Sequence, residues 1–164
     1  MEYHIRKRPR LEGYNYSSEG TYFITICAKD KQCILGSCVG GGVLDAPQTL
    51  LSKEGEIVEK YIHEIDRTYP YLRVDKYVIM PNHLHILLTV SADDGTSRTP
   101  SPTNAIVPRT VSTLKRFIHK ECGTTIFQRS YHDHVVRCEE DYRRIWEYID
   151  TNPQKWQDDR YFTP

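Results

Sequence analysis

The sequence predicts an α+β fold: a ferredoxin-like sandwich with an antiparallel sheet (β-α-β-β-α-β), followed by a C-terminal helix that carries a tyrosine. Three observations lead to this class. The predicted strands and helices follow the order β-α-β-β-α-β-α along 164 residues. A short Pro81-Asn82 connection joins two apolar runs, which therefore pair as an antiparallel hairpin. The hydrophobic share of 38% and the charged share of 27% are typical of a globular protein, and we expect residues 1–164 to form a single domain.

The first half of the chain predicts one strand, one turn-rich segment and one helix. Residues 21–28, TYFITICA, are rich in β-branched and aromatic side chains and predict a strand. Glycines and a proline punctuate residues 29–48, where a small hairpin fits. Residues 50–66 predict a helix because their apolar side chains recur at helical spacing. That apolar stripe consists of Leu51, Val58, Ile62 and Ile65.

The second half of the chain begins with the central hairpin. Residues 73–80 and 83–90 predict its two strands. Three prolines and many small polar residues in 91–108 predict a long mobile loop. The remaining predicted elements are a helix at 110–122, a partly irregular strand at 126–137, a helix from 139 to about 152 that Pro153 ends, and a short tail at 153–164.

The chain carries 22 basic and 22 acidic side chains, so its formal net charge is zero. This balance argues against a protein that binds polyanions indiscriminately, but it leaves room for local basic surfaces. On the helix at 110–122 we expect Phe117 and other apolar residues to face the core, with a basic face outward. The candidates for DNA contacts are an N-terminal cluster and this basic face: Arg6, Lys7, Arg8 and Arg10, and Lys115, Arg116 and Lys120.

Neither a membrane nor a disulfide framework is expected. No apolar run approaches the roughly 20 residues needed to cross a bilayer. No apolar segment follows the basic N-terminus, as it would in a secretory signal. The five cysteines are odd in number and form no CxxC pair, which argues against a disulfide framework or a zinc–thiolate site. These features predict a cytoplasmic protein.

Two histidines one residue apart are the sharpest chemical signal in the sequence. On the strand at 83–90, His83 and His85 point to one face, while Leu84 and Ile86 point to the other. We expect the second face to pack under the two main helices and the histidine face to be open. Two imidazoles on one face can bind one divalent cation and leave positions for water or substrate. By itself, the pattern also fits two half-buried polar residues at the start of a strand.

The last predicted helix adds a tyrosine and an asparagine on one flank. Its apolar stripe consists of Tyr142, Ile145, Trp146 and Ile149. Tyr148 lies about 100° from the centre of that stripe, and Asn152 lies one turn beyond Tyr148. A phenol can act as a nucleophile, and a carboxamide oxygen can bind a metal ion. By itself, a helical tyrosine also fits a packing role.

In combination, the segments PNHLHILL and EYIDTNPQKW resemble the single-tyrosine transposases of the HUH endonuclease superfamily. These include insertion-sequence transposases and REP-associated tyrosine transposases. The HUH motif matches His83-Leu84-His85, the family's tyrosine matches Tyr148, and its third metal ligand matches Asn152. The segments GYNYSSEGTYFITICAKD and YHDHVVRCEEDY are also similar, so the resemblance covers nearly the whole chain.

The resemblance implies a transposase-like single-stranded DNA endonuclease and strand-transferase that uses Mg²⁺ or Mn²⁺ held by His83, His85 and Asn152. Tyr148 would attack the scissile phosphate, expel a 3′-hydroxyl and form a 5′-phosphotyrosine. Single-stranded or hairpin DNA is the implied partner. The implied location of the protein is the cytoplasm, associated with the nucleoid, as in prokaryotes. The resemblance leaves both a homodimer and a monomer open. A free phenol has a pKa near 10, and we identify no general base for Tyr148.

Two other interpretations stay open at this point. The first is a domesticated nucleic-acid hairpin-binding protein without cleavage activity. The second is an unrelated hydrolase in which the histidine pair activates water. Tyr131 and Tyr142 are rival nucleophiles, although Tyr142 belongs to the apolar stripe. Tyr131 begins the segment YHDH, which fits either a second metal site or a polar turn.

Overall fold

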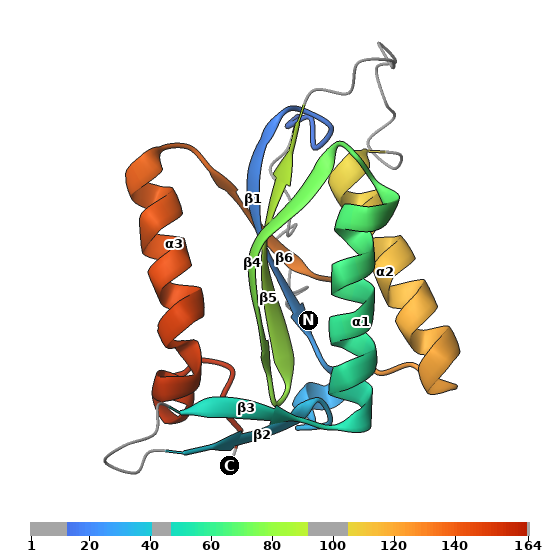
Figure 1. Cartoon of the computed structure of the whole chain (residues 1–164), viewed down its shortest axis with the longest axis vertical. Helices are drawn as coiled ribbons and strands as arrows, with labels where there is room; N and C mark the ends of the chain where they lie inside the picture. Colours follow the sequence, from blue (N-terminus) through green and yellow to red (C-terminus); the bar gives the residue numbers. More distant parts are fainter. Residues whose placement is uncertain (1–12, 41–46, 92–104, 164) are drawn as a thin grey trace, which may run out of the picture.

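The structure, a computed structural model, has a four-stranded sheet with two helices on one face and a third on the other (Figure 1). It describes residues 13–40, 47–91 and 105–163, and no helix in these ranges is long and apolar enough to cross a membrane. The sheet strands are β1 (Gly20–Cys27), β4 (Leu72–Met80), β5 (His83–Val90) and β6 (His132–Val136). The helices are α1 (Lys53–Thr68), α2 (Ile106–Cys122) and α3 (Glu139–Thr151), with the short 3₁₀ helices η1 (Lys29–Lys31) and η2 (Asn152–Asp158).

The sheet has the strand order β4-β5-β1-β6, and each neighbouring pair is antiparallel. This order results from two interleaved β-α-β units, in which one unit's strand lies between the two strands of the other. The predicted α+β class, including the additional C-terminal helix, is therefore confirmed. The β4–β5 hairpin turns at Pro81-Asn82, as the short connection predicts.

Alternation along β5 separates two cores of unequal size. Leu84 and Ile86 point into the larger core, which lies beneath α1 and α2. Leu87 points the other way and packs with Ile145 and Ile149 of α3. The predicted core face of β5 is confirmed. The expectation that the opposite face is open is wrong, because α3 of the same chain covers it (Figure 1).

A separate two-stranded ribbon precedes α1 and matches the small hairpin expected in this region. Its strands are β2 (Gly36–Val39) and β3 (Gln48–Leu51). Leu50 and Leu51, which were predicted to lie in the first helical turn, belong to β3, so α1 starts later than predicted. The Ser52 hydroxyl caps this helix by accepting a hydrogen bond from the Gly55 N–H at 3.1 Å. Gly55 is needed because a Cβ atom there would lie 2.1 Å from the carbonyl oxygen of Leu35.

Helix α2 starts at Ile106, earlier than predicted. Pro108 lies in its first turn, where a missing N–H costs no helical hydrogen bond. The predicted mobile loop at 91–108 therefore runs into this helix, and residues 92–104 lie outside the described residues. Strand β6 is shorter than the strand predicted at 126–137, since Phe127 forms an isolated bridge with Ala28 before it.

Two predictions about the faces of α2 are wrong. Phe117, expected in the core, is 41% exposed, and its ring stacks on that of Tyr61 with centroids 5.8 Å apart. Lys115, expected in solvent, is 8% exposed. Its ammonium group donates hydrogen bonds to the carbonyl oxygens of Gln128 and Ser130 at 2.8 and 2.9 Å. These hydrogen bonds tie α2 to the segment that leads into β6.

The residues predicted as a short tail, 153–164, are folded against the sheet as far as residue 163. Helix η2 continues directly from α3 and includes Pro153 in its first turn. The chain then returns to the β4–β5 turn. There the carbonyl oxygen of Tyr161 and the hydroxyl of Thr163 accept hydrogen bonds from the Asn82 amide at 2.7 and 3.2 Å. This segment therefore forms one wall of the region around the histidines.

Candidate metal and nucleophile site

His83 and His85 lie at the start of β5, an inner strand of the sheet. They stand opposite Cys27 and Thr25 of β1 in the antiparallel ladder. Both imidazoles are 0% exposed, and their ring centroids are 4.7 Å apart. The strand therefore brings the two predicted ligands together in a fully buried position beneath α3 and the C-terminal segment.

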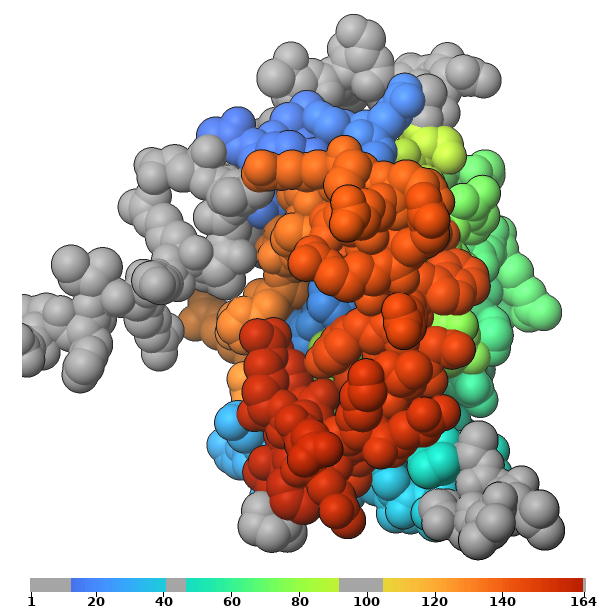
Figure 2. Space-filling model, turned by 90° about the vertical axis from the view of Figure 1, so that its left-hand side faces the viewer, coloured from blue at the N-terminus to red at the C-terminus, as the bar shows by residue number. Residues whose placement is uncertain are grey.

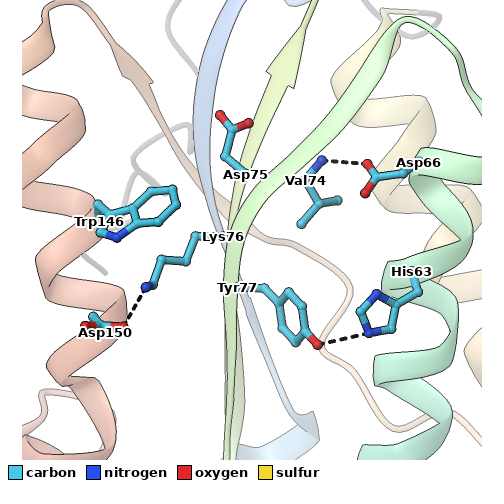
Figure 3. Close-up of a pocket in the computed structure, with 8 residues that line it drawn as sticks. All are labelled: His63, Asp66, Val74, Asp75, Lys76, Tyr77, Trp146 and Asp150. Carbon is cyan, nitrogen blue, oxygen red and sulfur yellow. Dashed lines mark hydrogen bonds and ion pairs between the residues drawn. The ribbon is translucent and has the colours of Figure 1, made fainter.

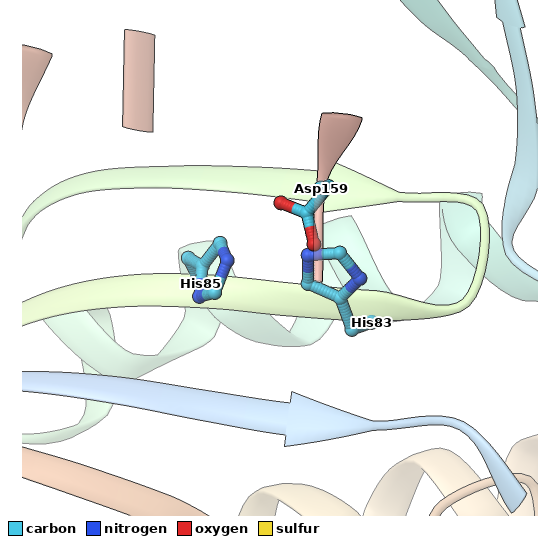
Figure 4. A group of neighbouring side chains, drawn as sticks. All are labelled: His83, His85 and Asp159. Carbon is cyan, nitrogen blue, oxygen red and sulfur yellow. The ribbon is translucent and has the colours of Figure 1, made fainter. Parts of the chain in front are cut away.

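A carboxylate that the sequence did not indicate joins the two histidines. One ligand atom from each of His83, His85 and Asp159 lies within 4.8 Å of the other two. Figure 4 shows the three side chains together at the start of β5. Asp159 follows η2, and its Oδ1 accepts a hydrogen bond from the Tyr161 N–H at 2.7 Å. Two imidazoles and a carboxylate are a donor set that fits a divalent cation.

Two buried atoms at this site lack a hydrogen-bond partner within the described residues: Nε2 of His83 and Oδ1 of Asn152. An unpaired buried polar atom costs about 1–3 kcal/mol. Each atom can offer a lone pair to a cation, which would offset that cost. Asn152, the predicted third ligand, also donates a hydrogen bond from Nδ2 to Asp159 at 3.1 Å. The residues present therefore fit a metal ion, with Asp159 added to the predicted set.

Tyr148 of α3 reaches the same cluster. Its hydroxyl oxygen lies 3.4 Å from Nε2 of His85 and donates a hydrogen bond to Asp159 at 3.3 Å. The helix is held here because Ile145 and Ile149 pack against the sheet. The Tyr148 side chain flanks this apolar face and remains 37% exposed. The phenol is thus in contact both with the buried cluster and with solvent.

Burial determines the protonation of these groups. It lowers the pKa of His83 to about 4, against the opposing effect of the Asp159 carboxylate. It also lowers the pKa of His85 well below its usual value, with a further contribution from the neighbouring His83. Both imidazoles are therefore neutral near pH 7, the state that binds metal ions. Burial and the charge of Asp159 raise the pKa of Tyr148 to about 12, so its phenol is protonated at neutral pH.

Arg160 is an exposed basic residue next to the cluster. Its positive charge contributes to lowering the pKa of His83 and of His85, and it opposes the rise in the pKa of Tyr148.

The surface of the molecule is hollowed between α3 and the C-terminal segment, with β1 visible at the base (Figure 2). The candidate site lies where these two segments meet.

Of the residues predicted to contact DNA, the three that the structure describes are not gathered at this site. Lys115 is no surface cation, because its ammonium is bonded to backbone carbonyls and burial lowers its pKa to about 8. Arg116 and Lys120 are exposed, but α2 lies on the face of the sheet opposite to α3 (Figure 1). The N-terminal candidates, which lie outside the described residues, are Arg6, Lys7, Arg8 and Arg10.

The two rival tyrosines lie apart from the cluster. Tyr142 neighbours Asp75 of β4, and burial together with this carboxylate raises the pKa of its phenol. Tyr131 is 6% exposed, and the Lys115 ammonium lies 5.9 Å from its ring centroid. Of the three tyrosines considered, Tyr148 is the one that contacts His85.

The segment after Tyr131 is neither a second metal site nor a turn. Residues His132–Val136 form strand β6 at the edge of the sheet. His134 pairs with Asp141 of α3, with Nε2 and Oδ2 2.7 Å apart. In the described part of the chain, the cluster that contains Asp159 is the one group of three His, Cys, Asp or Glu side chains with metal-binding geometry. The His134–Asp141 pair therefore fastens α3 to β6.

A cavity of about 540 Å³ lies on the other flank of α3, between this helix, β4 and α1 (Figure 3). Its charged groups are already paired. Lys76 forms an ion pair with Asp150, and its ammonium lies 4.5 Å from the Trp146 ring centroid. Asp66 accepts a hydrogen bond from the backbone N–H of Val74 at 2.7 Å. These contacts hold both helices against β4 and explain why Trp146 is partly exposed.

Sequence reasoning missed Asp159 and Arg160. Both follow η2 in the run Gln157–Arg160, QDDR, which has no periodicity relative to the histidines or to Tyr148. A usable signal was the tail's aromatic content. Tyr161 packs on His83 with ring centroids 4.6 Å apart. An aromatic residue that anchors the tail in this way brings its charged neighbours, Asp159 and Arg160, to the site.

Comparison with known proteins identifies relatives in sequence. The chain is 34% identical over 175 residues to an uncharacterised protein of Haemophilus influenzae, covering 97% of this chain and 94% of that protein. It is 24% identical over 141 residues to a REP-associated tyrosine transposase of Escherichia coli, covering 85% of this chain and 70% of that protein. No protein-family model matches the chain.

A solved structure shares the fold. It is a REP-associated tyrosine transposase bound to a REP hairpin, which superposes with a TM-score of 0.59 at 23% identity over 89% of this chain and 74% of that one. The resemblance that the sequence motifs predicted is therefore confirmed. The similarity in sequence supports a function in the transposase family, and the solved structure shows that the fold is shared.

Proposed function

We propose that this chain, a relative of the REP-associated tyrosine transposases, is a metal-dependent single-stranded DNA endonuclease and strand-transferase of the HUH type. The observation that carries the proposal is the Tyr148 hydroxyl, 3.4 Å from Nε2 of His85 and 3.3 Å from Asp159. A nucleophile beside a cluster of metal-binding side chains is an arrangement suited to the transfer of a phosphoryl group to tyrosine.

His83, His85 and Asp159 would hold Mg²⁺ or Mn²⁺, with the amide oxygen of Asn152 as a further ligand. The low pKa of the imidazoles and the unpaired Nε2 of His83 support this assignment. When bound, the cation would supply a Lewis acid that stabilises negative charge on the scissile phosphate. The carboxylate of Asp159 adds one negative charge to a ligand set that is otherwise neutral.

The Tyr148 oxygen attacks the phosphorus of the scissile phosphodiester. A new P–O bond joins the 5′ side of the break to Tyr148, while the P–O3′ bond breaks and the 3′ oxygen leaves as a hydroxyl after taking up a proton from water. Asp159 accepts the hydrogen bond of the phenol and so receives its proton as the attack begins. Attack of a 3′-hydroxyl on the phosphotyrosine reverses these steps and rejoins a strand without an external energy source.

The proposed substrate is single-stranded DNA next to a hairpin. This part rests on the resemblance, since the relative with the shared fold was solved bound to a REP hairpin. Arg160, exposed beside the site, is the proposed contact for the scissile phosphate. Arg116 and Lys120 remain proposed contacts for more distant phosphates, and Lys115 does not.

Incubation with labelled single-stranded DNA and Mn²⁺, followed by denaturing electrophoresis, tests the proposal. We expect a denaturation-resistant adduct that Tyr148→Phe abolishes while DNA binding is kept. Tyr142→Phe, which removes a phenol from the same helix, is the matched control and keeps the adduct. DNA binding without any adduct would favour a hairpin-binding protein. Free 5′-phosphate ends made by Tyr148→Phe would indicate a hydrolase that activates water.

A further inference from the structure

Asn82 does more than close the β4–β5 turn. Its side chain is 1% exposed and forms hydrogen bonds at both ends. Its Oδ1 lies 2.8 Å from Nδ1 of His83. Its Nδ2 lies 2.7 Å from the carbonyl oxygen of Tyr161 and 3.3 Å from that of Lys31, and 3.2 Å from the hydroxyl of Thr163. One buried amide thus connects the start of β5, η1 and the C-terminal segment.

These partners fix the orientation of the amide. The carbonyl oxygens of Tyr161 and Lys31 can only accept hydrogen bonds, so the NH₂ group of Asn82 must face them. The oxygen of Asn82 must then face His83, and an amide oxygen can only accept. Nδ1 of His83 therefore carries the proton, and Nε2 keeps its lone pair. This is the nitrogen that has no hydrogen-bond partner in the described structure.

The same amide bears on the carboxylate of the cluster. It holds the carbonyl of Tyr161, and the N–H of Tyr161 donates to Oδ1 of Asp159 at 2.7 Å. That hydrogen bond leaves Oδ2 of Asp159 directed at Tyr148 and Asn152. The imidazole and the carboxylate come from distant parts of the chain. Asn82 is hydrogen-bonded to His83 itself and to Tyr161, two residues after Asp159.

We propose that Asn82 is a positioning residue for the metal site. It selects the His83 tautomer in which Nε2 is the free ligand, and it holds the C-terminal segment so that Asp159 meets that ligand. Hydrogen bonds to metal ligands typically contribute about 10–100-fold to metal affinity. This role rests on the metal site of the proposed function.

Thr25 provides the contrast within the same site. Its hydroxyl lies 2.8 Å from Nδ1 of His85, the equivalent contact for the second imidazole. A hydroxyl can donate or accept, so Thr25 orients the ring without selecting its tautomer. In Asn82, the carbonyl partners fix the position of the NH₂ group, so the amide oxygen faces His83 and selects one tautomer of that imidazole.

The tautomer can be measured directly in the metal-free wild-type protein, with no substitution. Long-range ¹H–¹⁵N NMR correlations distinguish a proton on Nδ1 from one on Nε2, and we expect His83 to carry it on Nδ1. A proton on Nε2 of His83 would overturn the proposal.

Two variants then separate the two ends of the amide. Asn82→Ala removes both, and we expect a 10–100-fold loss of Mn²⁺ affinity by isothermal titration. Asn82→Asp keeps an acceptor for His83 but loses the donor, so His83 keeps its tautomer while amide exchange at 159–163 becomes faster. Asn15→Ala, at an exposed turn asparagine, is the control and leaves each quantity unchanged.

The outcomes distinguish this inference from the proposed function. Wild-type protein that binds no Mn²⁺ would overturn the metal site and, with it, the role of Asn82. Wild-type protein that binds Mn²⁺ together with an Asn82→Ala variant of unchanged affinity would overturn the positioning role alone. Should Asn82→Ala fail to fold, unchanged exchange at 159–163 in Asn82→Asp would contradict the link to the C-terminal segment.

Discussion

The hydroxyl oxygen of Tyr148 lies 3.4 Å from Nε2 of His85, although 63 positions separate the two residues in the chain. Two elements produce this contact. Strand β5 aims the imidazole away from the larger core, and α3 covers that face of the sheet (Figure 1). A helix anchored through its apolar face thus presents a polar flank to the histidines. The fold itself, within one chain, assembles the candidate nucleophile and metal ligands.

Replacing Asp159 with asparagine should weaken metal binding without unfolding the protein. The change keeps the size of the side chain and removes one negative charge from the cluster. Since even indirect partners of metal ligands contribute about 10–100-fold to affinity, we expect at least a tenfold loss of Mn²⁺ affinity by electron paramagnetic resonance. Asp158→Asn, at the exposed neighbouring position, should bind like wild type. Equal affinities for the two variants would exclude Asp159 as a ligand.

Arg160 should act on the DNA and not on the metal. Arg160→Gln removes the guanidinium that lies over the Tyr161 ring next to the cluster. We expect the rate of adduct formation to fall by about tenfold or more, because a positive charge near a scissile phosphate stabilises the transition state. Mn²⁺ affinity should not fall. Arg67→Gln, an exposed arginine on α1, controls for the loss of one positive charge. An unchanged rate in Arg160→Gln would rule out the phosphate contact.

Lys115 should contribute to folding and not to DNA binding. Its ammonium bonds the carbonyls of Gln128 and Ser130. Lys115→Met leaves these carbonyls without their donor, so we expect the free energy of unfolding in urea to fall by about 1–3 kcal/mol. The folded variant should bind hairpin DNA with unchanged affinity and salt dependence. Arg116→Met is the exposed comparison and should show the reverse: full stability and a weaker dependence of DNA binding on salt.

The buried imidazoles should make stability depend on pH. Burial lowers the pKa of His83 from 6.5 to about 4. Between pH 4 and pH 6.5 the unfolded chain binds more protons than the folded one. The free energy of unfolding therefore rises as the pH rises and decreases as the pH falls. For His83 alone we expect a loss of about 2 kcal/mol between pH 7 and pH 5, and His85 acts in the same direction.

Urea titrations of the metal-free protein at several pH values measure this slope. His83→Asn should flatten it, whereas His132→Asn, at an exposed position of β6, should not. An identical slope in wild type and His83→Asn would contradict the burial of a neutral imidazole.

Local patterns were sufficient to predict the sheet and its helices. Alternation along β5, the two-residue turn and the apolar stripe of α3 each depend on residues close together in the chain. Element boundaries were less accurate where local signals conflict. Gly55 weakened the start of α1, yet close packing against Leu35 requires it. The outward assignment of Lys115 was wrong because helical periodicity carries no information about the carbonyls that its long side chain reaches.

The site was predicted in part for the same reason. His83, His85, Tyr148 and Asn152 stand at regular spacings within a strand and a helix, and the structure brings them together. Asp159 enters through an irregular segment that returns to the β4–β5 turn, and no periodicity relates it to the histidines. Its position depends on tertiary contacts such as Asn82 with Tyr161, which are visible only once the chain is folded.

The central claim is that Tyr148 is the nucleophile, and peptide mass spectrometry of the covalent protein–DNA adduct tests it most directly. Wild-type protein is incubated with single-stranded DNA and Mn²⁺, the adduct is digested with protease and nuclease, and the modified tyrosine is located. The account predicts a residual 5′-phosphonucleotide on the peptide that contains Tyr148. A nucleotide on Tyr131 or Tyr142, or cleavage that leaves every tyrosine unmodified, would contradict it.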